Sequence, residues 1–101
     1  MAVIAPIILS LILIITGIIN IDGNISTIHW YNRRKVSKAD APKYGRLMGY
    51  GTITTGIAVL LSAIAEIFFK TDTIWLITAF GCATGLIFIL YAQFKYNKGI
   101  F

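Results

Sequence analysis

Three long apolar segments, separated by polar ones, dominate the pattern of the chain. Residues 3–21 carry no charge, residues 47–69 carry only Glu66, and residues 74–94 carry none. A helix rises about 1.5 Å per residue and the hydrocarbon core of a bilayer is about 30 Å thick, so each segment is long enough to cross it. The pattern predicts an all-α membrane protein with three transmembrane helices in a single integral membrane domain.

Two connections of unequal length join the expected spans. Residues 22–46 are polar and basic and are expected to lie at the membrane interface, with Ser37 and Asp40 as capping residues and Pro42 near a helix start. Residues 70–73 (KTDT) are few, so the second and third spans must form a tight antiparallel hairpin.

Composition supports lipid as the solvent of the chain. Hydrophobic residues make up 57% of it and charged residues only 13%, against about a quarter charged in soluble domains. The formal net charge is +5. A soluble nucleic-acid-binding protein carries its basic patch on an ordinary polar surface, which this composition does not provide, so nucleic acid is not an expected partner.

The basic residues indicate an orientation. Residues 22–46 hold six Lys and Arg, the tail 95–101 holds two, and residues 70–73 hold one. In a three-span chain the first connection and the tail share one side, so the positive-inside rule predicts a cell-membrane protein with its N-terminus outside and its C-terminus in the cytoplasm. The six in the connection are also candidate contacts for anionic lipid or for a partner protein: Arg33, Arg34, Lys35, Lys38, Lys43 and Arg46.

Aromatic residues near the span ends are expected to anchor the chain at headgroup depth. On the cytoplasmic side the set includes Tyr44, Tyr50, Tyr91 and Tyr96. Gln93 lies near the same boundary and is expected to be hydrated.

Small residues at helical spacing predict where helices approach closely, because close backbone contact drives helix association in lipid. The candidates are Gly45, Gly49 and Gly56 in the second span and its approach, and Gly81 and Gly85 in the third span. Mutual packing of these two spans is the first expectation, and a contact between copies of the chain is the alternative. The first span offers fewer such residues, chiefly Ser10 and Gly17, and is expected to pack loosely or against a partner. Cys82 is expected to serve helix packing.

Glu66 is the candidate intramembrane polar site. A carboxyl group in lipid can carry protons or bind a cationic substrate. A structural role is the competing interpretation, because Lys70 follows at i+4 near the end of the span. The Ser and Thr residues within the second and third spans can bond to their own helix backbone and need no pore to explain them.

Catalytic and metal-binding patterns are missing from the sequence. It contains one Cys, one His and four carboxylates without ligand-like spacing, and no nucleophile is paired with a base. A non-enzyme without a metal or cofactor is therefore expected.

Three short motifs carry a family resemblance: Tyr31-Asn32, Ser37-Lys38-Ala39-Asp40 and Arg46-Leu47-Met48-Gly49. With the three-span layout they resemble a family of small bacterial membrane proteins classed as a domain of unknown function. The triplet Arg33-Arg34-Lys35 and Pro42 depart from the family pattern. The resemblance implies an architecture and a bacterial setting, and no mechanism.

Three functions remain open from the sequence. The first is a non-enzymatic accessory or structural subunit that binds a larger membrane protein or anionic lipid through helix contacts and the basic connection. The second is a homo-oligomeric channel or transporter that uses Glu66. The third is immunity or stress protection at the membrane.

Overall fold

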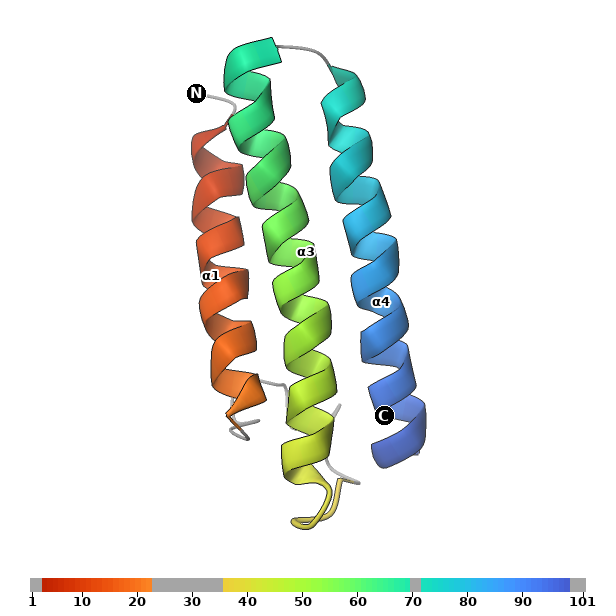
Figure 1. The fold of residues 1–101 in the computed structure, drawn as a ribbon. Coiled ribbons are helices and arrows are strands. Elements are labelled where there is room, and N and C mark those ends of the chain that lie inside the picture. Colours follow the sequence, from red (N-terminus) through yellow and green to blue (C-terminus); the bar gives the residue numbers. More distant parts are fainter. Residues whose placement is uncertain (1–2, 23–35, 70–71, 99–101) are drawn as a thin grey trace.

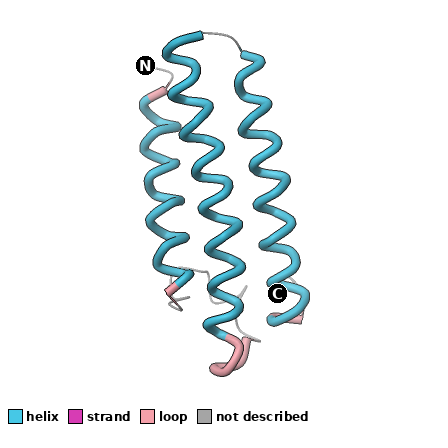
Figure 2. The backbone as a smooth tube through the Cα atoms, in the orientation of Figure 1, coloured by secondary structure: helices cyan, strands magenta, loops and turns pink. Residues whose placement is uncertain are grey.

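Helices make up almost all of the part of the chain that the computed structural model describes, and no strand occurs there. The described residues are 3–22, 36–69 and 72–98. They form α1 (Ile4–Ile21), α3 (Ala41–Phe69), a short 3-10 helix (Asp72–Trp75) and α4 (Leu76–Tyr96) (Figures 1 and 2). Three stretches, Ile4–Ile21, Ala41–Phe69 and Thr73–Tyr96, are long and apolar enough to cross a membrane. The expected all-α fold with three spanning helices is confirmed.

Helix α3 begins at Ala41, six residues before the expected start of the second span at residue 47. The Ser37 Oγ accepts a hydrogen bond from the Asp40 N–H at 3.2 Å, so Ser37 is the capping residue of the turn that leads into the helix. The helix begins at Ala41, with Pro42 in its first turn, where the missing N–H costs little. Its 29 residues are about 43 Å long, more than the hydrocarbon core, so its ends extend beyond that core.

Helix α3 is the central element of the bundle. Helices α1 and α4 each pack along it in the antiparallel direction and make little contact with each other (Figure 1). The start of α1 lies at the same end of the bundle as the end of α3, and the end of α4 lies at the opposite end. Both outer helices therefore depend on α3 for their position.

A pair of glycines holds α1 against α3. A Cβ added at Gly49 would lie 2.5 Å from the Gly17 carbonyl oxygen, and one added at Gly17 would lie 2.9 Å from the Gly49 carbonyl oxygen. Two turns further along α3, a Cβ at Gly56 would lie 3.1 Å from the Ser10 carbonyl oxygen. The two backbones meet without intervening side chains, which is the contact that small residues allow in lipid.

A second pair of glycines holds α4 against α3. A Cβ at Gly51 would lie 2.6 Å from the Gly85 carbonyl oxygen, and one at Gly85 would lie 2.5 Å from the Gly51 carbonyl oxygen. One turn before Gly85, Gly81 faces Ala58 of α3. Near the link, the Thr78 hydroxyl donates to the Ser62 Oγ at 2.8 Å across the same contact.

These two contacts use opposite sides of α3. Gly49 and Gly51 are two residues apart, and each residue turns a helix by about 100°, so they point about 200° apart. The expected packing of the second span on the third is present, but it uses Gly51, Thr55 and Ala58 of α3. Gly49 and Gly56 pack on α1 instead, which is held tightly rather than loosely. Gly45 is buried as well.

The outer faces of all three helices are covered by large apolar side chains. Their exposed members include Ile8, Ile15, Leu61, Phe80 and Ile87. Cys82 is exposed on α4, so the expectation that it serves helix packing is wrong. It lies one residue after Gly81, about 100° away from the contact with α3.

We predict that Gly49→Ala and Gly85→Ala each destabilise the bundle by about 1–3 kcal/mol. The added methyl group is forced against a backbone carbonyl, and this overpacking outweighs the gain in helix propensity. Reversible unfolding in bicelles measures the effect. Ala83→Leu is the control, because Ala83 is exposed two residues before Gly85. Glycine variants as stable as the unchanged protein would contradict the prediction.

Candidate functional site at the basic end

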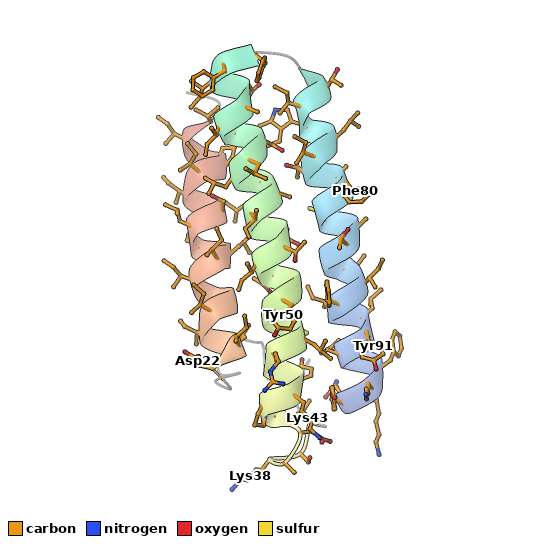
Figure 3. The ribbon with its side chains drawn as sticks, viewed as in Figure 1. Asp22, Lys38, Lys43, Tyr50, Phe80 and Tyr91 are labelled. Carbon is orange, nitrogen blue, oxygen red and sulfur yellow. The ribbon has the colours of Figure 1, made fainter. Side chains whose placement is uncertain are left out.

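The described basic residues gather at one end of the bundle, which we call the basic end. This end comprises Lys38, Lys43, Arg46, Lys95 and Lys98, all with exposed side chains. Lys38 and Lys43 lie at the start of α3, beside the end of α4 (Figure 3). The antiparallel arrangement of α3 and α4 therefore joins basic residues that are about fifty positions apart in the sequence.

The two ends of the bundle differ in charge. Two carboxylates, Asp22 and Asp40, accompany the five basic residues of the basic end. Near the opposite end the described charged side chain is that of Glu66. A positive potential is thus expected at the basic end, which favours anionic groups.

A buried polar cluster lies behind the exposed charges of the basic end. Tyr44 is fully buried, and its hydroxyl donates to Oε1 of Gln93, which is 3% exposed. Asn20 near the end of α1 and Asn97 after α4 are also buried. Within the described residues no buried side-chain nitrogen or oxygen lacks a hydrogen-bond partner. The cluster is therefore satisfied, as buried polar groups must be if they are to stabilise a fold.

The apolar surroundings explain why Tyr44 and Gln93 pair. Tyr44 packs with Met48 and Ala92, and this small core is extended by Val36, Leu47, Ile89 and Tyr96. A hydroxyl in such a core costs stability unless it finds a partner, and Gln93 of α4 supplies the acceptor. The bond joins α3 to α4 on the same side as the Gly51–Gly85 contact.

Two sequence expectations fail in this cluster. Tyr44 is buried instead of lying at the surface as an anchor, and Gln93 is buried instead of hydrated. Spacing offers a signal for both: Tyr44 precedes Gly51 by seven residues and Gln93 follows Gly85 by eight, so each lies on the packing face of its helix. Tyr50 and Tyr91 are 43% and 52% exposed and fit the anchoring role.

Glu66 lies apart from the basic end, near the other end of α3. Its side chain is half-buried, three residues before the helix ends at Phe69. Its expected partner, Lys70, lies outside the described residues. Arg33, Arg34 and Lys35 and the Tyr31-Asn32 motif also lie outside them.

The hydroxyl groups within the spans bond to helix backbone, as expected, with one exception. Thr52, Thr55 and Thr84 each donate to the carbonyl oxygen four residues earlier. Thr54 and Ser62 do the same. Thr78 instead donates across the helix contact to Ser62. These hydroxyls therefore contribute to helix geometry and to one contact between helices.

The chemistry available at the basic end is electrostatic binding. Among the described residues no group of three or more His, Cys, Asp or Glu side chains is arranged to hold a metal ion. Comparisons with protein-family models, with curated proteins and with solved structures gave no match to this chain. The candidate site is therefore defined by its own geometry and not by similarity to a known protein. It consists of exposed cations around buried, hydrogen-bonded polar side chains.

We predict that Tyr44→Phe lowers the free energy of unfolding by about 1 kcal/mol, because the buried Gln93 loses the hydroxyl that donates to it. A double-mutant cycle combines Tyr44→Phe with Gln93→Leu, and reversible unfolding measures the free energy of each variant. The cycle should show a coupling energy between the two positions. Tyr50→Phe is the matched control on an exposed side chain. Strictly additive effects of Tyr44→Phe and Gln93→Leu would contradict the assigned bond.

Proposed function

We propose that the protein is a non-enzymatic accessory or structural subunit of a bacterial cell membrane. In this proposal the N-terminus lies outside, the basic end faces the cytoplasm, and the protein acts through lateral helix contacts and through the basic connection, residues 22–46. A larger membrane protein and anionic lipid are its partners. The bacterial setting is implied by the family resemblance of the motifs at Tyr31-Asn32 and Arg46-Leu47-Met48-Gly49.

One observation carries the proposal: the glycines and the buried polar groups of the described helices are used inside the chain. Gly17, Gly49, Gly51 and Gly85 are occupied by contacts between helices of the same chain. The buried polar atoms of this part are all hydrogen-bonded. What the helices present to their surroundings is a lateral apolar surface and a basic end, which suits binding to lipid and to other membrane helices.

The charge distribution supports the proposed orientation. The described Lys and Arg side chains all belong to the basic end, whereas the described side chain of Glu66 lies near the other end. Multi-pass proteins generally keep Lys and Arg on the cytoplasmic side, so this asymmetry supports an orientation with the basic end in the cytoplasm.

Cysteine labelling tests the orientation. In a Cys82→Ala background, we expect Thr73→Cys to react with a membrane-impermeant maleimide in intact cells. Lys38→Cys at the basic end should react only after the cells are permeabilised. Both side chains are exposed, so access to the reagent decides the outcome. The reverse labelling pattern, or equal labelling of both positions, would refute the orientation.

Purification tests the accessory role. We expect the tagged chain, extracted from its native membrane in a mild detergent, to retain one membrane protein in a fixed ratio. Triple substitution of Arg33, Arg34 and Lys35 by Gln should weaken this association or the binding to anionic vesicles. A monodisperse homo-oligomer without a second protein would count against the proposal.

A further inference from the structure

The last turn of helix α4 carries a lysine, Lys95, that contacts two tyrosines. Lys95 Nζ donates to the Tyr91 hydroxyl at 3.1 Å. It lies 5.3 Å from the centroid of the Tyr91 ring and 5.5 Å from that of Tyr96. Both distances fall within the range of about 6 Å at which a cation is attracted to an aromatic face. An exposed lysine normally samples many rotamers, so these contacts fix the position of this ammonium group before any ligand arrives.

The fixed ammonium group lies on the lateral surface of the bundle. Tyr91 is 52% exposed and points away from α3 (Figure 3), and Phe94, directly before Lys95, is 61% exposed. One turn earlier than Tyr91, Ile87 is 69% exposed. Lys98, three residues after Lys95, is exposed as well. Along this face of α4 an apolar side chain is followed by aromatic rings and then by the cation of Lys95, whereas Lys98 lies beyond the end of the helix.

That order matches the order of groups in a phospholipid that lies alongside a helix. Acyl chains would contact Ile87 and Phe94, and the phosphate would lie at the height of Lys95. The ammonium has three N–H donors and uses one on Tyr91, and the Tyr91 hydroxyl accepts that bond and keeps its own proton to donate. Among the described residues no carboxylate pairs with Lys95, so its charge is available to an anion.

We propose that Lys95 and the Tyr91 hydroxyl bind the phosphate of an anionic glycerophospholipid at the membrane interface. The six basic residues expected from the sequence to bind lipid lie in residues 22–46, so this is an additional site, on α4. It rests on the proposed function in one respect, because the basic end must lie at a headgroup layer. An acidic peptide fits less well, since the site continues into an apolar helix face that a water-soluble ligand would leave uncovered.

Native mass spectrometry of the full chain, with phosphatidylglycerol or phosphatidylcholine added to the detergent solution, tests the site. We expect Lys95→Gln to weaken the first phosphatidylglycerol binding event about fivefold and to leave phosphatidylcholine unaffected. Tyr91→Phe should weaken it by a smaller factor, because the cation loses its anchor and the phosphate loses a donor. Lys95→Arg should bind nearly as well as the unchanged chain.

Lys43→Gln is the comparison, since Lys43 is an exposed lysine at the same end, on α3, and itself a candidate lipid contact. It should lower the affinity for phosphatidylglycerol by a smaller factor than Lys95→Gln, because no tyrosine contact positions its ammonium group in the described structure. Equal losses in Lys43→Gln and Lys95→Gln would overturn the site in favour of diffuse attraction, and no loss in Lys95→Gln would overturn it outright. Binding of a polyglutamate peptide that depends on Lys95, without binding of the anionic lipid, would also overturn the proposed lipid site. If Lys95→Gln fails to fold, the phosphatidylglycerol affinities of Tyr91→Phe and Tyr50→Phe are compared instead. A larger loss in Tyr91→Phe supports the site, and equal affinities overturn it.

The results also separate this site from the proposed function. If the unchanged chain shows no preference for the anionic lipid, the lipid-binding part of the proposed function fails together with the site. If the preference exists and persists in Lys95→Gln, only the site fails.

Discussion

Two close contacts between glycines, at one level of α3 and on opposite sides of it, determine the geometry of this bundle. Gly49 meets Gly17 of α1, and Gly51 meets Gly85 of α4, each with the backbone of one helix against the other. In lipid the hydrophobic effect does not press helices together, so packing of this kind must supply the association. Because α1 and α4 make little contact with each other, the loss of either glycine pair would weaken the attachment of one outer helix without support from the other.

The register that these contacts impose brings the polar groups of the bundle together. With Gly51 opposite Gly85, an antiparallel pair places Tyr44 opposite Gln93 at one end and Ser62 opposite Thr78 at the other, and both pairs are hydrogen-bonded. The same register places the basic start of α3 beside the basic end of α4. The charged end of the molecule is thus a consequence of where the helices touch.

The sequence predicted the features that depend on one helix at a time, and missed those that depend on two. Apolar runs of about twenty residues predict three spans, and the turn at Ser37 and Pro42 predicts a helix start. A four-residue step such as Gly81–Gly85 predicts a close approach and does not name the partner. Gly51 falls outside the series of Gly45, Gly49 and Gly56, so that series does not predict the second packing face of α3. It therefore does not predict that Tyr44 and Gln93 are buried on this face. The contact of Lys95 with Tyr91 follows from their i to i+4 spacing. From the sequence alone, the charge of Lys95 indicates only the orientation of the chain.

The proposed accessory role rests on the contacts that the described helices make with one another. These contacts leave an apolar lateral surface and a basic end for lipid and neighbouring proteins. The central claim is that both glycine contacts form within one chain. Solid-state NMR in bilayers, with carbon-13 in the glycines, tests it directly. We expect cross-peaks for Gly17–Gly49 and Gly51–Gly85 that persist when the labelled chain is diluted with unlabelled chain. Cross-peaks that are absent, or that disappear on dilution, would contradict the account, because the glycine faces would then join separate molecules.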